Sequence, residues 1–112
     1  MSFKKVTAIF DQIKLIDVEN ALKAHSHIGF TVHSVEGKGK DAYVGLYDRN
    51  TLSLHIQMDI YTNQNCALQV AQIIIDAAHS NSEDEGLVVI SDVDTLFWIH
   101  TKQQVSNKEL KL

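Results

Sequence analysis

Proline is absent from this chain of 112 residues, and cysteine occurs only once, as Cys66. A lone cysteine cannot close a disulfide within the chain, which is typical of proteins in a reducing compartment. Long apolar runs are missing as well, since no stretch reaches membrane-spanning length and the N-terminus lacks the apolar core of a signal peptide. These absences predict a cytoplasmic protein without membrane insertion.

An excess of positive charge is also missing. The net charge is −4 at pH 7, which gives no case for a surface that binds nucleic acid. Hydrophobic residues make up 45% and charged residues 21%, which is typical of a globular protein. The length predicts a single domain, which we place at residues 1–104. We expect the C-terminal tail, residues 105–112, to be frayed or docked on another subunit.

The most regular pattern in the chain is the stretch Thr51–Thr62, with the sequence TLSLHIQMDIYT. Aliphatic residues alternate with polar or aromatic ones along it, and this period of two predicts a β-strand with one apolar face. The other face is mixed in character. Such a strand is typical of an antiparallel sheet that has helices on one side only.

The remaining elements surround this central strand. Alternation predicts strands at Lys4–Phe10, Phe30–Glu36 and Leu96–Thr101, and a short strand buried on both faces at Leu87–Ile90. Helical spacing predicts one helix from near Asp17 to about His25 and a second over Asn65–His79. The apolar stripe predicted for the second helix consists of Leu68, Ala71, Ile74, Ile75 and Ala78.

The resulting order, β-α-β-loop-β-α-β with a short extra strand, is that of the ferredoxin-like α+β fold. Its two helices cover one face of an antiparallel sheet, and no part of the chain remains to cover the other. Leaving Val35, Tyr61 and Trp98 in water across a whole sheet face is unfavourable. We therefore expect oligomerisation to bury them.

The segment Gly37–Asn50 departs from this regularity. It holds three glycines and two tyrosines, Tyr43 and Tyr47, without apolar periodicity. It connects two strands that should pair, yet it is far longer than a tight hairpin. Long loops in small domains are typically functional, and tyrosine is favoured in binding hot spots, so we expect this loop to contact a partner.

Several segments, in order and nearly without gaps, resemble the PII signal-transduction family. KKVTAIFDQIKLIDVENAL is similar to the family's first strand and helix, and GFTVHSVEGKGK to the Gly-x-Thr-Val strand that enters its T loop. AYVGLYDRN resembles part of the T loop, IIIDAAHS the end of the second helix, and VVISDVDTLFWIHT the last two strands. The similarity covers about residues 3–101.

The resemblance implies a homotrimer that binds adenine nucleotides in clefts between subunits. It also implies a T loop, here residues 37–50 with Tyr43 and Tyr47, that docks onto a transporter, enzyme or regulator. Such a protein is not catalytic; it senses a ligand and regulates its partner. Carried over position by position, the cleft residues are Ile9, Thr31, Gly37, Gly39, Lys40, Asp59, Tyr61, Gly86, Trp98 and His100.

The same positions also depart from the family pattern. The family's glycine-rich phosphate loop and following lysine correspond here to SNSEDEG, residues 80–86, and Leu87. The family's two arginines on the last strand correspond to Trp98 and His100. Each carboxylate ~4 Å from a phosphate opposes binding by about 4 kcal/mol at an effective dielectric near 20. We therefore expect that ATP does not bind in the usual pose, which leaves the nucleotide unidentified.

Two other interpretations stay open. His33 and His55 lie on strands that should pair, and neutral imidazoles there suit zinc, copper or nickel. Trimeric ferredoxin-like proteins include the divalent-cation tolerance family, so a trimeric metal-binding or tolerance protein is one alternative. A ligand-free adaptor is the other. An enzyme is the least supported class, since no nucleophile, base and orienting group can be assembled from the sequence.

Overall fold

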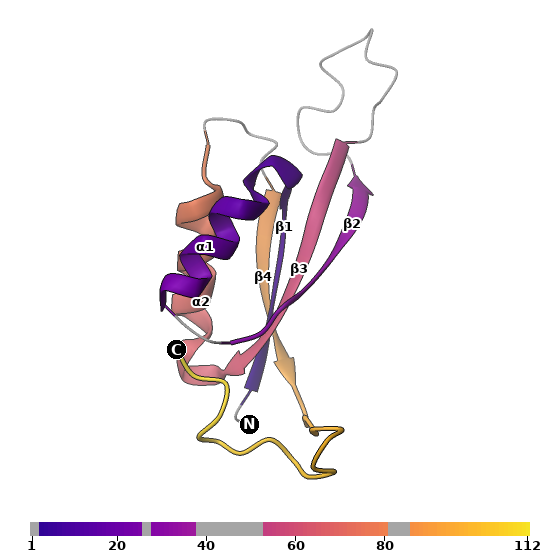
Figure 1. Cartoon of the computed structure of the whole chain (residues 1–112), viewed down its shortest axis with the longest axis vertical. Coiled ribbons are helices and arrows are strands. Elements are labelled where there is room, and N and C mark those ends of the chain that lie inside the picture. The colour runs from indigo at the N-terminus through magenta and orange to yellow at the C-terminus, as the bar shows by residue number, and fades with distance from the viewer. Residues whose placement is uncertain (1–2, 26–27, 38–52, 81–85) are drawn as a thin grey trace, which may run out of the picture.

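The computed structural model describes residues 3–25, 28–37, 53–80 and 86–112. Its main elements are β1 (Phe3–Asp11), α1 (Leu15–His25), β2 (Thr31–Gly37), β3 (Ser53–Asn63), α2 (Ala67–Ala78) and β4 (Gly86–Val93). Short 3-10 turns, Gln12–Lys14 and Gln64–Cys66, precede the two helices. Figure 1 shows the strands running side by side next to the two helices.

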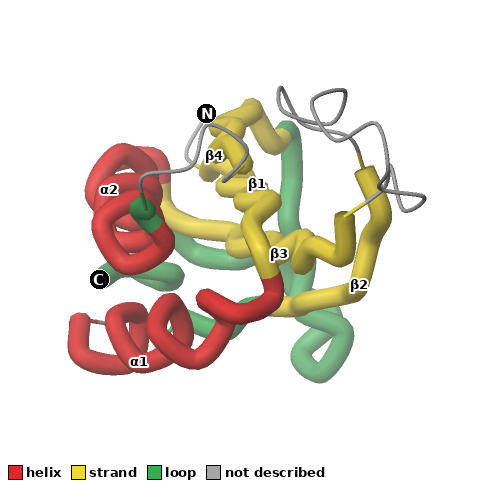
Figure 2. The backbone as a smooth tube through the Cα atoms, turned by 90° about the horizontal axis from the view of Figure 1, so that it is seen from above, coloured by secondary structure: helices red, strands yellow, loops and turns green. Residues whose placement is uncertain are grey.

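The sheet has the strand order β2-β3-β1-β4, and all neighbouring strands are antiparallel. Both helices lie on the same face of the sheet, as the view from above in Figure 2 shows. This arrangement confirms the predicted ferredoxin-like fold. The opposite face, which we call the open face, carries no helix from residues 3–25, 28–37, 53–80 or 86–112.

The helix side of the sheet carries the core. Met58 on β3 is fully buried and Ile60 is 2% exposed, and both lie beside the buried Val6 and Ala8 of β1. The helices contribute buried residues to the same cluster: Val18, Leu22, Ala67, Val70, Ala71 and Ile74. Burying one large apolar side chain contributes about 1.5–3 kcal/mol, so this cluster holds the helices on the sheet. The alternation predicted for the central strand is confirmed over residues 56–61, whereas His55 is buried although it lies on the other face.

Each helix is entered through a capped turn. Asp11 Oδ1 accepts a hydrogen bond of 2.9 Å from Ile13 N at the end of β1. Asn63 Oδ1 accepts one of 3.1 Å from Asn65 N at the end of β3. These bonds satisfy backbone donors that a starting helix leaves free, and they turn the chain from the sheet into the helix layer.

The predicted apolar stripe of α2 is partly wrong. Leu68 is 79% exposed and Ile75 is 43% exposed, whereas Val70 and Ile74 are buried against the sheet. α2 carries more apolar residues than the sheet can cover. Periodicity therefore does not decide which of them face the sheet, and the packing of α2 on β1 does.

The end of the predicted sheet is also different. β4 is longer than the predicted strand, and it lies at the edge of the sheet. It was predicted to be buried on both faces, but Leu87 is 56% exposed and Val89 is 45% exposed. The predicted last strand over residues 96–101 does not form. Phe97 makes an isolated bridge to Gln104, and the chain turns at residues 99–101.

Beyond this turn, residues 104–112, which we call the C-terminal segment, fold back on their own chain. Val105 is 8% exposed. Leu110 O accepts hydrogen bonds from Asn63 N at 2.8 Å and from Thr62 Oγ1 at 3.1 Å. In Figure 1 the segment runs beneath the strands toward the lower end of α2. The segment is therefore held on its own chain, whereas the sequence analysis expected a tail that is frayed or docked on another subunit.

Candidate functional site

Aromatic side chains gather at the end of the sheet nearest the C-terminal segment. A pocket of about 470 Å³ is lined there by Gly29, Phe30, Thr31, Asp59, Tyr61, Leu96, Phe97, Trp98, Val105 and Leu110. Four of the chain's eight aromatic residues are among them. We call this the aromatic pocket. Clustered rings with a few polar groups suit a flat ligand that is apolar on its faces and polar at its edge.

Asp59 is the one carboxylate among the described residues that line the aromatic pocket, and β1 holds it in place. Thr7 Oγ1 donates a hydrogen bond of 2.9 Å to Asp59 Oδ1, and Lys5 Nζ lies 3.9 Å from the same oxygen. Lys5 Nζ also lies 6.0 Å from the centroid of the Tyr61 ring, at the limit of a cation–π contact. The β1–β3 register places all four residues on the open face. Lys5 thus balances the charge of Asp59.

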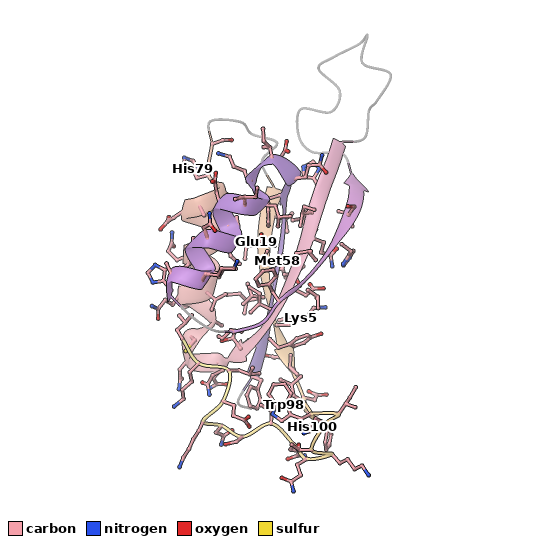
Figure 3. All side chains as sticks on the ribbon, in the orientation of Figure 1. Lys5, Glu19, Met58, His79, Trp98 and His100 are labelled. Atoms are coloured by element: carbon pink, nitrogen blue, oxygen red, sulfur yellow. The ribbon has the colours of Figure 1, made fainter. Side chains whose placement is uncertain are left out.

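Trp98 lines the aromatic pocket from a turn and not, as predicted, from a strand. Its backbone N donates to Gln103 O, and its backbone O accepts from Lys102 N, both at 2.9 Å. Its indole Nε1 donates to Glu109 Oε2 at 3.1 Å. Figure 3 shows Trp98 and His100 together beyond the end of the sheet. His100 is exposed and does not line the pocket.

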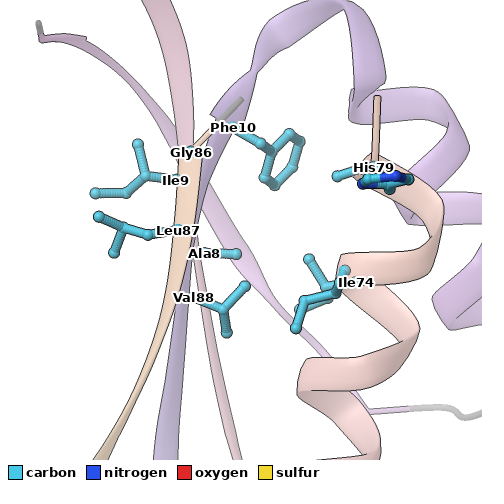
Figure 4. A pocket seen from close by; sticks show the side chains of 10 residues that line it. Ala8, Ile9, Phe10, Ile74, His79, Gly86, Leu87 and Val88 are labelled. Carbon is cyan, nitrogen blue, oxygen red and sulfur yellow. The ribbon is translucent and has the colours of Figure 1, made fainter. Parts of the chain in front are cut away.

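A second pocket, of about 230 Å³, lies between α2 and the strands β1 and β4. It is lined by Ala8, Ile9, Phe10, Ile74, Ile75, Ala78, His79, Gly86, Leu87 and Val88, and we call it the aliphatic pocket. In Figure 4, Phe10 and Val88 point toward α2, whereas Ile9 points away from it. The two pockets share no lining residue.

The predicted cleft residues fall into separate groups. Those that the structure brings together in the aromatic pocket are Thr31, Asp59, Tyr61 and Trp98. Ile9 and Gly86 line the aliphatic pocket, and Gly37 ends β2. The predicted residues that lie outside the described part of the chain are Gly39, Lys40, Tyr43 and Tyr47, together with the acidic residues 83–85.

The two histidines considered as metal ligands are diagonal neighbours on the open face. The β2–β3 register pairs His33 with Gln57 and His55 with Val35. His33 is exposed, whereas His55 is 6% exposed. Within the described ranges, no group of three or more His, Cys, Asp or Glu residues is placed to hold a metal ion.

Six residues of the aromatic pocket were not selected from the sequence: Gly29, Phe30, Leu96, Phe97, Val105 and Leu110. Phe30 and Phe97 each precede a selected residue along the chain, so the clustering of aromatic residues was an available signal. Val105 and Leu110 carry no local signal. Their place in the pocket depends on how the C-terminal segment returns to the sheet.

Comparison with known proteins assigns the chain to a family. The family described as Nitrogen regulatory protein P-II matches residues 3–103. The chain belongs to this family. Nitrogen regulatory protein P-II 2 of Methanothermobacter thermautotrophicus is 31% identical over 103 residues, which cover 88% of this chain and 90% of that protein. Nitrogen regulatory protein GlnK2 of Haloferax mediterranei is 30% identical over 105 residues, which cover 88% of this chain and 84% of that protein.

Solved structures show the same fold. The crystal structure of Arabidopsis thaliana PII bound to citrate matches with a TM-score of 0.80 and 21% identity, covering 96% of this chain and 92% of that one. The family is one of regulatory proteins, and this chain is a PII-like signalling protein. No helix in the described part of this PII chain is long and apolar enough to cross a membrane.

Proposed function

We propose that this PII protein is a cytoplasmic homotrimer that senses an adenine nucleotide in clefts between subunits. It signals to a protein partner through residues 37–50 and acts by binding, without catalysis. The aromatic pocket is the observation that supports this most. Its residues Thr31, Asp59, Tyr61 and Trp98 come from three separate segments, yet they line one pocket. A flat base stacks on such rings, while the hydroxyl and carboxylate orient its edge.

The open face supports the trimer. Leu87, Val89 and Tyr61 share this face and are 56%, 45% and 39% exposed. An apolar face of this kind favours contact with further copies of the chain. Moreover, the cleft residues fall into two groups. The first is in the aromatic pocket at one end of the sheet, and the second, at the other end, consists of Ile9 and Gly86 on β1 and β4 and of Gly37 on the opposite edge strand, β2. We propose that each cleft combines the first group of one subunit with the second group of its neighbour.

The ligand we propose carries few phosphates. Among the residues that the structure describes, the aromatic pocket is lined by a carboxylate, Asp59, and by no Lys, Arg or His. The nearby Lys5 is already engaged with that carboxylate. Trp98 and His100 occupy the positions at which the P-II family has two arginines. This chain therefore lacks two side chains whose positive charge would pair with phosphates. We therefore place AMP and cyclic AMP ahead of ADP and ATP.

A thermal-shift panel tests this ranking. Purified protein is heated with ATP, ADP, AMP, cyclic AMP, zinc, nickel or copper. A ligand that binds only the native state at 100 times its Kd adds about 2.7 kcal/mol of stability, and we expect AMP or cyclic AMP to raise Tm accordingly. Tyr61→Ala should lose the shift, and Leu68→Ala, on the exposed side of α2, should keep it. A shift with metal alone would replace the sensor by the metal-binding alternative, and no shift would favour the adaptor.

A deletion tests the signalling half of the proposal. Removing residues 40–49 should abolish binding of the protein partner, since this segment is the one we assign to docking. Light scattering should show the same trimer mass for the deletion variant and for the full chain. A partner that binds both proteins equally would contradict the proposed role of residues 37–50.

A further inference from the structure

The match to the description of the P-II family ends at residue 103, just before the C-terminal segment. Two of its residues, Val105 and Leu110, nevertheless line the aromatic pocket. One wall of the candidate ligand site is therefore built from residues beyond the matched range.

Asn63 anchors this segment to the end of β3. Its side chain is buried, its backbone N donates to Leu110 O at 2.8 Å, and its Nδ2 donates to Asn107 O at 2.6 Å. Thr62 Oγ1, which is also buried, donates to Leu110 O at 3.1 Å. Buried donors that lose their acceptors are unfavourable, so these bonds resist release of the segment. The wall is thereby coupled to the sheet.

The backbone of Leu110 supports the same view. Its φ of 58° lies in the left-handed region, which residues other than glycine seldom adopt. Such a conformation persists only where the surroundings hold it. Here the carbonyl of Leu110 accepts two hydrogen bonds from the end of β3, from Thr62 and Asn63. The position of the Leu110 side chain in the pocket lining is thus determined by tertiary contacts.

Glu109 connects the same segment to the ring of Trp98. Glu109 Oε2 accepts the hydrogen bond from Trp98 Nε1 at 3.1 Å, and Glu109 Oε1 accepts one from Ser106 N at 2.7 Å. The carboxylate therefore ties the indole to the backbone of the C-terminal segment. Trp98 is 39% exposed, so packing alone leaves its ring considerable freedom. A ligand that stacks on an already ordered ring avoids the entropy loss of ordering it.

We propose that the C-terminal segment is the specificity-determining wall of the aromatic pocket, and that Glu109 is a positioning residue that fixes Trp98 for stacking on a flat heteroaromatic ring. This inference rests on the proposed function and names the part of the chain that selects the ligand. The wall combines the aliphatic side chains of Val105 and Leu110 with the indole of Trp98. It therefore favours the uncharged base of a nucleotide over a charged group.

The fluorescence of Trp98 gives a direct test, because it is the only tryptophan in the chain. Full-length wild type is compared with Glu109→Ala, Glu109→Gln and the control Lys108→Ala, which alters the neighbouring exposed side chain. We expect Glu109→Ala to increase acrylamide quenching of Trp98 and to weaken AMP binding about fivefold, because the ligand must then order the ring itself. Glu109→Gln retains one acceptor oxygen in place of two and should fall between. Lys108→Ala should match the wild type.

Leu110→Ala tests the aliphatic part of the wall separately. It keeps the backbone carbonyl that Thr62 and Asn63 bind, so the segment stays in place. We expect AMP to bind about fivefold more weakly, because apolar contact with the base is lost, while quenching of Trp98 is unchanged.

The outcomes separate this inference from the proposed function. If the wild type binds AMP and Glu109→Ala binds it equally with unchanged quenching, the positioning role is wrong and the sensor function stands. If Leu110→Ala binds AMP as the wild type does, the wall does not determine specificity. If the wild type binds neither AMP nor cyclic AMP, the sensor function and the specificity role both fail, and quenching in Glu109→Ala still decides whether Glu109 positions Trp98.

Discussion

The two ends of the sheet are held in different ways. At the Gly86 end, where β4 begins, Gly86 has φ +118° and a Cβ on it would lie 1.8 Å from Ile9 O. This close approach to β1 is possible only without a side chain. At the tail end, where β3 stops, Asn63 receives the C-terminal segment through hydrogen bonds to residues more than forty positions away. One end is held by a close approach between two strands of the sheet, and the other by contacts with the C-terminal segment.

The two pockets differ in the same way as the two ends of the sheet. The aliphatic pocket lies between α2 and the strands it covers, and its lining follows from the fold itself. The aromatic pocket depends in addition on where residues 96–110 return. The comparison teaches that the family fold supplies the frame of the candidate site, whereas the C-terminal segment completes it. Four predictions test how independent the two ends are.

The largest effect is expected at the Gly86 end. Gly86→Ala adds a Cβ at a left-handed φ and against the backbone of β1, so we expect the free energy of unfolding to fall by about 4 kcal/mol. Gly29→Ala is the matched control, because no atom lies within 4 Å of its added Cβ, and it should change stability by less than about 0.5 kcal/mol. Urea unfolding at one protein concentration measures both. Equal stability of the two variants would contradict the role of Gly86.

The next effect concerns the core between the two ends. Met58 is fully buried on the helix side of β3, and Met58→Ala should cost about 3 kcal/mol through lost burial and a cavity. Leu68→Ala should cost less than about 0.5 kcal/mol, because Leu68 is 79% exposed on α2. Calorimetric melting gives both values. A large loss in Leu68→Ala would restore the apolar stripe predicted from the sequence.

A smaller effect is expected at the tail end. Asn63→Ala removes the hydrogen bonds to Asn107 O and from Asn65 N, so we expect a loss of about 2 kcal/mol. Hydrogen exchange should rise mainly in residues 104–112, which would separate this end from the Gly86 end. Asn65→Ala keeps the backbone donor and serves as the control. Unchanged protection of the C-terminal segment in Asn63→Ala would argue that other contacts hold it.

The smallest effect concerns the ion pair that joins β1 and β4 near the tail end. A hydrogen bond from the Lys4 ammonium, together with its charge, lowers the pKa of Asp92 from its usual 3.8. A carboxyl whose pKa is lower in the folded state stabilises the fold above its unfolded pKa, and this contribution is lost as the pH falls through the folded pKa.

The urea midpoints of wild type and Asp92→Asn should therefore differ slightly at pH 7 and converge as the pH falls below 3.8. Asp94→Asn, at a nearby exposed carboxylate without an ion pair to any described residue, is the control. A gap between wild type and Asp92→Asn that is independent of pH would rule out the ion pair as its cause.

Much of the fold was predictable because its signals are local. The alternation in the central strand correctly assigned Ile56, Met58 and Ile60 to the buried face. The caps at Asp11 and Asn63 have short side chains at the ends of predicted strands, and the order of elements implied the ferredoxin-like sheet. Family resemblance then selected Thr31, Asp59, Tyr61 and Trp98, which the structure brings into one pocket.

Predictions from the same local signals were wrong where an apolar stretch could be buried against more than one part of the protein. On α2, Val70 is buried and Leu68 is exposed, because only one side of the helix packs on the sheet. The stretch LFWIHT alternates like a strand, but it does not join the four-stranded sheet β2-β3-β1-β4. It bends back at residues 99–101 and bonds to residues 103–105 instead.

The sequence by itself determined the two faces of the sheet, the order of its elements and membership of the PII family, because side-chain periodicity and the order of motifs can be read along the chain. Only the tertiary structure decided that the C-terminal segment returns to Asn63, that Glu109 holds the indole of Trp98, and that Leu110 completes the aromatic pocket. These contacts join residues that are distant in the chain. Their energy depends on the whole packed arrangement, so no short stretch of sequence can specify them.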